Sequence, residues 1–146
     1  MMVIPHVCVN AAAGRLFSRR VTALTAGIVG HAILDLVPHK DVSAHAAEGL
    51  MASIMLGIVG TSCGFNSAPF WCAVGGMLPD VEQVLPWTDP ERGRRRWFPT
   101  HSRWLHSWTI PGRRDYRVDL LTQGAISLAA LMISITRCRQ RAAAPS

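Results

Sequence analysis

The stretch LMASIMLGIVGTSCGFNSAPFWCAVGGML, residues 50–78, decides the fold and carries no ionisable side chain other than cysteine. It is too long for one ordinary membrane crossing, which takes about 20 apolar residues. Its middle, CGFNSAP at residues 63–69, combines glycine, asparagine, serine and proline, which favour turns. We therefore expect two helices, residues 49–63 and 69–87, joined as a hairpin, with Pro79 kinking the second helix near its end.

Apolar segments on both sides of this hairpin continue the pattern. They predict further helices over residues 4–18, 21–38 and 118–136. Residues 88–117 are polar, rich in arginine and tryptophan, and interrupted by proline and glycine, so we expect a long loop with one short helix around residues 102–108. The chain of 146 residues is thus expected to be a single all-α domain, a small helical integral membrane protein of four to five short apolar helices.

The composition favours a membrane protein over soluble and disordered classes. Apolar residues make up 49% of the chain and charged residues 16%, whereas about 25% charged is usual in soluble domains. With a mean hydropathy of +0.22, this excludes a disordered tail or a solvated basic arm. The net charge of +6 comes from arginines grouped between the apolar segments, as in loops that flank membrane helices. We expect membrane lipid as the partner; nucleic-acid binding by residues 92–96 is the less favoured interpretation.

The four cysteines, Cys8, Cys63, Cys72 and Cys138, form no C-x-x-C pair. This spacing indicates neither a disulfide framework nor a thiolate zinc site. We therefore expect reduced cysteines that fill apolar surroundings, as free cysteine commonly does.

Ionisable residues inside apolar helices are the first candidates for chemistry, because such a group costs about 2.5–3.5 kcal/mol in a membrane helix. His31 and Asp35 are four residues apart and share one helix face, where a nitrogen and a carboxylate oxygen can bind one metal ion. The alternative is a hydrogen bond between the two that allows both to be buried. His39 is a further four residues along and would share this helix face, but Pro38 ends the helix before it.

A second cluster follows the apolar hairpin. Asp80 and Glu82 come directly after Pro79, where a turn of the backbone can direct both carboxylates at one point. For Glu82 the alternative is an acidic helix end at the membrane interface.

A third cluster lies in the segment FPTHSRWLHSW, residues 98–108. His101 and His106 are five residues apart, so they converge only in a loop or an irregular turn. Arg103 lies between them and can bind an anionic group. The alternative is a belt of tryptophans and arginines at the depth of the lipid headgroups.

Helices of alternating direction would bring these clusters to one side of the membrane. A three-crossing arrangement without the hairpin would separate the clusters instead. The nitrogen and oxygen donors suit zinc first, with manganese or iron as alternatives. The expected ligands are His31, Asp35, Asp80, His101 and His106, with His6 and His39 as second choices. They exceed what one ion uses, which leaves room for a second ion or for Asp35 or Glu82 as a general base.

These residues resemble the motifs of the membrane-bound metal-dependent hydrolases of the YdjM-like (LexA-regulated inner-membrane) type. The early histidine precedes a helix of small residues at PHVCVNAAAG, and the L-P-D-x-D motif is similar to LPDVE at residues 78–82. The H-R-x-x-T-H-S motif is similar to HSRWLHS, and the S-H-x-x-x-D motif to GHAILD. Here the histidine–aspartate helix comes before the Pro-Asp segment, and Glu82 replaces the second aspartate.

The resemblance implies a multi-pass protein of a bacterial-type inner membrane that hydrolyses a substrate at a metal ion. A lipid-linked or other phosphoester, with Arg103 near its anionic group, would suit a site at headgroup depth. The alternative is a non-catalytic membrane protein with a structural or degenerate metal site that acts as a scaffold. On the site's side lie Lys40 and eight arginines, against six arginines opposite, which favours a cytoplasmic site.

Overall fold

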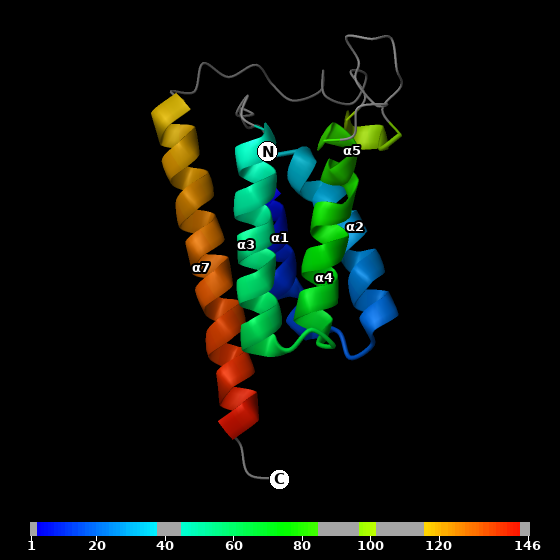
Figure 1. Ribbon diagram of the computed structural model, residues 1–146, viewed down its shortest axis with the longest axis vertical. Helices are drawn as coiled ribbons and strands as arrows, with labels where there is room; N and C mark the ends of the chain where they lie inside the picture. The colour runs from blue at the N-terminus through cyan, green and yellow to red at the C-terminus, as the bar shows by residue number, and fades with distance from the viewer. Residues whose placement is uncertain (1–2, 38–44, 85–96, 102–115, 144–146) are drawn as a thin grey trace.

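Helices make up all the regular secondary structure in the described part of the chain, residues 3–37, 45–84, 97–101 and 116–143 of a computed structural model (Figure 1). The all-α fold class is therefore confirmed. The α-helices are α1 (Val3–Ala13), α2 (Arg20–Asp35), α3 (His45–Cys63), α4 (Ala68–Met77), α5 (Val81–Val84) and α7 (Tyr116–Ala143). The short 3-10 turns are η1 (Gly14–Leu16), η2 (Leu78–Asp80) and η5 (Pro99–His101).

The expected hairpin between α3 and α4 is present. Gly64, directly after α3, has a positive φ of 91°, a conformation that glycine adopts without steric cost. The Ser67 hydroxyl then caps α4 by accepting a hydrogen bond of 3.2 Å from the Phe70 backbone N–H. Pro79 breaks the predicted helix 69–87 into α4, η2 and α5, so the kink at this proline is also confirmed.

Several helix ends differ from the sequence expectation: α2 ends at Asp35 and α3 begins at His45, where residues 38 and 49 were expected, and two other differences are larger. The first helix stops at Ala13, where η1 tightens the chain before Phe17 takes an extended conformation. The last helix continues beyond the predicted end at residue 136 as far as Ala143. The residues added there are mainly arginine, glutamine and alanine, which are strong helix formers, so polarity alone does not end the helix.

The central helix is α1, which contacts α2, α3, α4 and α7 (Figure 1). The α2–α4 pair approaches closely because glycines face each other across it. A methyl group added at Gly27 would lie 2.1 Å from the Cys72 carbonyl oxygen, and one at Gly75 would lie 2.1 Å from the Leu24 carbonyl oxygen. Small residues that let backbones approach are typical of membrane helix interfaces.

Over residues 118–134, helix α7 buries mainly polar side chains and exposes mainly apolar ones. Its buried stripe recurs at helical spacing and contains Asp119, Gln123, Ser127, Ala130, Leu131 and Ser134. Its exposed residues include Val118, Leu121, Ile126, Leu128, Met132 and Ile133. This pattern is the reverse of a helix on a water-soluble domain, which turns its apolar face inward.

Among the described residues, one helix is long and apolar enough to cross a membrane, residues 117–140 within α7. Helix α3 contributes a shorter apolar segment, Ala47–Cys63. Large apolar side chains are also exposed on α2 and α3, among them Val21, Ile33, Leu50 and Ile54. The structure thus contains one candidate membrane span and further exposed apolar surface.

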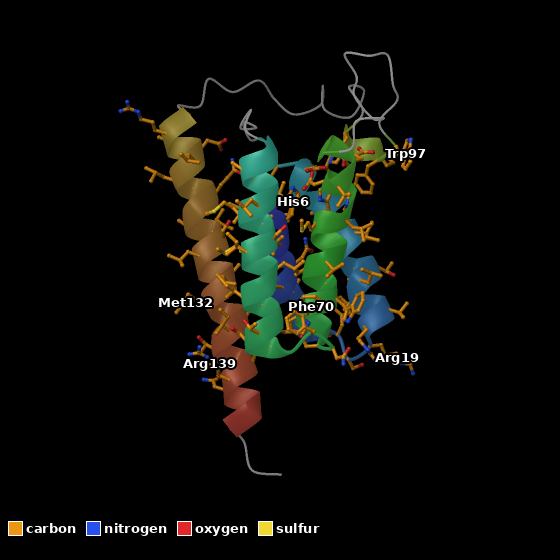
Figure 2. The ribbon with its side chains drawn as sticks, in the orientation of Figure 1. His6, Arg19, Phe70, Trp97, Met132 and Arg139 are labelled. Atoms are coloured by element: carbon orange, nitrogen blue, oxygen red, sulfur yellow. A yellow bond between two sulfur atoms is a disulfide. The ribbon has the colours of Figure 1, made fainter. Side chains whose placement is uncertain are left out.

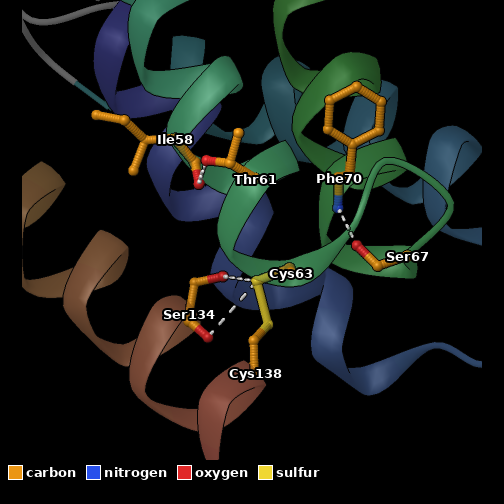
Figure 3. The surroundings of a disulfide bond; sticks show 7 residues. All are labelled: Ile58, Thr61, Cys63, Ser67, Phe70, Ser134 and Cys138. Atoms are coloured by element: carbon orange, nitrogen blue, oxygen red, sulfur yellow. Dashed lines mark hydrogen bonds between the residues drawn. A yellow bond between two sulfur atoms is a disulfide. The ribbon is translucent and has the colours of Figure 1, made fainter. Parts of the chain in front are cut away.

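Cys63 and Cys138 form a disulfide bond that joins the end of α3 to α7 (Figure 3). The expectation that all four cysteines are reduced is therefore wrong for this pair. Cys63 also lies beside Ser134, one helical turn before Cys138 (Figure 3). Only the packing of α7 on α3 brings residues so distant in the sequence together. Cys8 and Cys72 are free and buried, as expected.

Candidate metal centre

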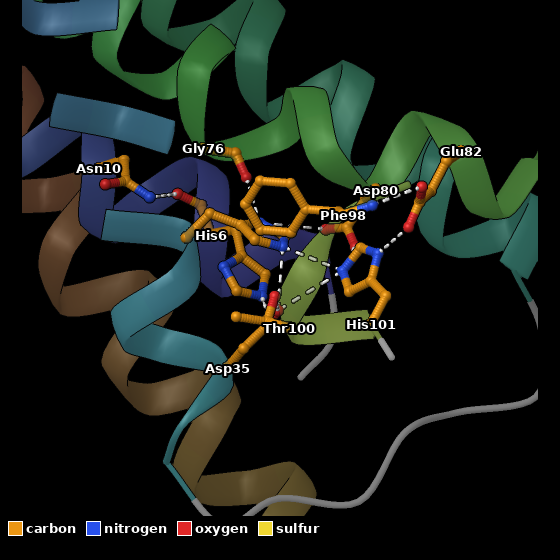
Figure 4. Close-up of polar contacts among 10 residues, drawn as sticks. His6, Asn10, Asp35, Gly76, Asp80, Glu82, Phe98, Thr100 and His101 are labelled. Atoms are coloured by element: carbon orange, nitrogen blue, oxygen red, sulfur yellow. Dashed lines mark hydrogen bonds and ion pairs between the residues drawn. The ribbon is translucent and has the colours of Figure 1, made fainter. Parts of the chain in front are cut away.

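Histidines and carboxylates from four segments of the chain meet inside one end of the helix bundle (Figure 4). The opposite end holds the α3–α4 turn, and Figure 2 shows His6 and Trp97 toward the first end and Arg19 and Arg139 toward the second. The contributors are α1, α2, η2 and η5. Two groups of three could each hold a metal ion, namely His6, His31 and Asp35, and His31, Asp80 and His101. All five side chains are buried.

Local sequence features explain how each segment presents its side chains. His31 and Asp35 lie one turn apart on the last turns of α2, and their Nε2 and Oδ2 atoms are 3.1 Å apart. Pro79 ends α4 and turns the chain through η2, which buries Asp80. The turn η5 places Thr100 and His101 side by side in the cluster.

Three donor atoms, on His31, His101 and Asp35, lie at distances that suit a shared ion, and a fourth, on Asp80, lies close to His101. The Nε2 atoms of His31 and His101 are 3.1 Å apart. His101 Nε2 is 3.5 Å from Asp35 Oδ2 and 3.5 Å from Asp80 Oδ1. Ligand atoms around a tetrahedral zinc ion are about 3.3 Å apart, given zinc–ligand distances near 2.0–2.1 Å. The observed spacing therefore fits an ion of this size.

The remaining ring nitrogens of two histidines have fixed partners. His31 Nδ1 is 2.8 Å from the Gly76 carbonyl oxygen, to which it donates. His101 Nδ1 donates to Glu82 Oε1 at 2.5 Å. Both Nε2 atoms are then unprotonated in the neutral rings, and their lone pairs face each other. That arrangement is repulsive unless a cation, either a proton or a metal ion, lies between them.

Three donors in the described part of the chain hold the Glu82 carboxylate. Besides His101 Nδ1, its Oε2 accepts hydrogen bonds from the backbone N–H groups of Trp97 and Phe98, at 2.7 and 3.1 Å. Glu82 therefore fixes the start of the η5 segment and orients His101. Histidine ligands of metal sites commonly donate their second N–H to a carboxylate in this way. This geometry favours an orienting role for Glu82, and its role as a general base stays a prediction.

Thr100 and Asn10 belong to the cluster although they were not singled out from the sequence. The Thr100 hydroxyl donates to Asp35 Oδ2 at 2.5 Å. The Asn10 side chain donates to the His6 carbonyl oxygen at 2.8 Å. The sequence signals were the position of Thr100 next to His101 and that of Asn10 one helical turn after His6.

Burial and charge shift the ionisation of the two 3-10 turn residues. Burial raises the pKa of Asp80 to about 6, although His31 and His101 oppose this shift. Burial alone would lower the pKa of His101, but its hydrogen bonds with Asp35 and Glu82 outweigh burial and raise it. A divalent cation would stabilise both residues in this buried site. It would neutralise the charge of the Asp80 carboxylate and take the place of the proton on the His101 imidazole.

The structure brings together six of the residues expected from the sequence: His6, His31, Asp35, Asp80, Glu82 and His101. His39, Arg103 and His106 lie outside the described residues. Comparison of the chain with protein-family models, curated proteins and solved structures finds no match. The resemblance to YdjM-like hydrolases therefore stays a prediction.

Proposed function

We propose that this protein is a membrane-bound metal-dependent hydrolase that binds a divalent ion between His31, His101, Asp35 and Asp80. The observation that carries the proposal is the pair of facing Nε2 atoms, 3.1 Å apart and flanked by buried carboxylates. Two carboxylates buried without a cation would be costly. The mixed nitrogen and oxygen donors favour zinc, with manganese or iron as alternatives.

The proposed reaction is hydrolysis of an ester or phosphoester bond. A bound divalent ion supplies Lewis-acid activation of water and of the scissile bond. Thr100 holds the Asp35 carboxylate in place, and Glu82 holds His101. Arg103 follows His101 by two residues in the sequence, and we assign it to the anionic group of the substrate.

A structural metal site without catalysis is the second candidate function. Burial of all the donor side chains favours it, because catalytic sites keep one coordination position open. Cobalt substitution distinguishes the two, since small anions such as azide change the cobalt absorption spectrum only where a position is open. A spectrum that does not respond to azide would support the structural site and contradict the hydrolase.

Membrane embedding is part of the proposal and is supported by the reversed polarity of α7. Its exposed residues are large and apolar, such as Leu121 at 72% exposed, while Asp119 and Gln123 face inward and hydrogen-bond to each other at 3.1 Å. The glycine contacts between α2 and α4 add to this, as does the exposed apolar surface of α2 and α3. We propose that these helices lie in the bilayer together with α7.

The disulfide supports one orientation of the protein in the membrane. Disulfides persist in oxidising compartments. The Cys63–Cys138 bond involves the last residue of α3, beside the α3–α4 turn, and Figure 1 shows this turn at the end of the bundle opposite α5. We propose that the metal centre faces the reducing, cytoplasmic side. In intact cells, a membrane-impermeant maleimide should then label Arg19→Cys and not Trp97→Cys. The reverse labelling would contradict the orientation and leave the metal proposal intact.

Metal analysis of detergent-purified protein tests the central proposal. We expect stoichiometric transition metal in the natural chain and its loss in His31→Ala and Asp80→Asn. Asp119→Asn is the matched control, because it removes the same charge from another buried carboxylate, on α7. If the natural chain holds no such metal, or if Asp80→Asn and Asp119→Asn retain equal amounts, the proposal is wrong.

A further inference from the structure

The two oxygens of the Asp35 carboxylate face different partners. Oδ2 lies 3.1 Å from His31 Nε2, 3.5 Å from His101 Nε2 and within hydrogen-bond distance of the Thr100 hydroxyl. Oδ1 instead lies 3.2 Å from His6 Nε2. The proposed ion at His31 and His101 therefore uses only one oxygen, and the other is directed at a further imidazole.

By distance alone His6, His31 and Asp35 could hold one ion, but the orientation of the two imidazole rings disfavours a shared ion. Their rings are stacked, with centroids 4.0 Å apart and planes only 26° from parallel. The lone pair of a ring nitrogen lies in the ring plane, so lone pairs of stacked rings run side by side and do not converge on a point about 2.0 Å from each nitrogen. In contrast, the rings of His31 and His101 are inclined by 71°, which lets their Nε2 atoms meet at one ion.

In the described part of the chain, the ring nitrogens of His6 have no polar contact other than the one with the Asp35 carboxylate. Its side chain is fully buried, and its Nδ1 has no hydrogen-bond partner among the described residues. Within the described ranges, its Nε2 faces the Asp35 oxygen. A buried imidazole whose one polar contact is a carboxylate oxygen is well suited to complete a second cation position.

We propose that Asp35 bridges two divalent cations, one bound by His31, His101 and Asp80 and a second bound by His6. This inference rests on the proposed metal centre and extends it to a two-ion centre. Ions in such centres lie about 3.5–4 Å apart, and carboxylates commonly bridge them. The second position has fewer protein donors than the first.

The second position is the weaker one. His31 and His101 each donate from Nδ1 to a fixed acceptor, Gly76 O and Glu82 Oε1, whereas His6 Nδ1 has none among the described residues. Loss of such an outer partner lowers metal affinity by about 10–100-fold. The two ions should therefore bind in two separate steps.

Metal titration of the full-length chain in detergent, after chelator treatment, tests this inference. Zinc should bind with two ions per chain, the second about 10–100-fold more weakly. Manganese should give the spin-coupled EPR spectrum of a close ion pair. His6→Phe keeps an aromatic ring against His31 and removes the nitrogen donors, so it should bind one ion with the affinity of the tight position unchanged.

Three results would overturn the inference. One ion per natural chain would remove the second position and leave the proposed function standing, whereas no ion at all would remove both. Weakening of the tight position by His6→Phe, with His6→Gln as a second variant, would make His6 a ligand of the first ion. The stoichiometry of the natural chain decides the question even where a variant fails to fold.

Discussion

Replacement of Glu82 by glutamine tests how the protein sets the protonation of His101. Glu82 uses Oε1 for His101 Nδ1 and Oε2 for the backbone N–H groups of Trp97 and Phe98. Glutamine has a single acceptor oxygen, and the two backbone donors require it. The amide NH2 group then faces His101 Nδ1, which must accept a hydrogen bond. The proton moves to Nε2, the atom that faces His31 and the carboxylates.

This change should weaken metal binding without removing any ligand. Loss of an outer partner of a ligating histidine costs about 10–100-fold in affinity. That corresponds to about 1.4–2.8 kcal/mol, since each factor of ten is about 1.4 kcal/mol. The side chain keeps its size, so the fold should be retained.

Zinc competition against a chromophoric chelator measures the affinity, with Asp119→Asn as the control for loss of a buried carboxylate elsewhere. Nitrogen-15 NMR of labelled histidine reports the tautomer of His101 in the metal-free protein. The reasoning is refuted if Glu82→Gln binds zinc within about twofold of the natural chain. It is also refuted if affinity falls while the Nδ1–H tautomer persists.

Three further changes test the fold. Gly27→Ala places a methyl group against the Cys72 carbonyl oxygen and should destabilise the protein by about 1–3 kcal/mol. Gly57→Ala is the control, because a methyl group there meets open space and should not destabilise the protein. Thermal unfolding in detergent compares the two variants. Cys63→Ser should lower stability by about 4 kcal/mol and slow migration on a non-reducing gel, and unchanged migration would contradict the disulfide. Leu128→Arg, at the centre of the candidate span, should impair membrane insertion by about 3–4 kcal/mol, whereas efficient insertion would argue against lipid contact at the exposed face of α7.

Local patterns in the sequence were sufficient for the hairpin and for part of the metal centre. Ser67 and Gly64 have the residue types that a helix cap and a tight turn require, so the turn was predictable. The four-residue spacing of His31 and Asp35 fixes their shared face on any helix. Pro79 identified the break that presents Asp80.

Features that depend on long-range packing were not predictable in the same way. The disulfide joins residues 75 apart, and no local pattern indicates which face of α7 meets α3. The role of Glu82 depends on the chain returning to it at Trp97 and Phe98. The stacking of His6 on His31 follows from how α1 and α2 pack together.

The disulfide also divides the metal centre between two topologically different parts of the chain. Closure of Cys63 with Cys138 makes a covalent ring that contains Asp80, Glu82, Thr100 and His101. His6, His31 and Asp35 lie outside the ring, on the linear segment that precedes α3. The centre therefore forms when a linear arm docks onto a ring. In an oxidised, unfolded chain the ring residues remain confined near one another, so the ring, and not the linear arm, has fewer conformations to search before the donors meet.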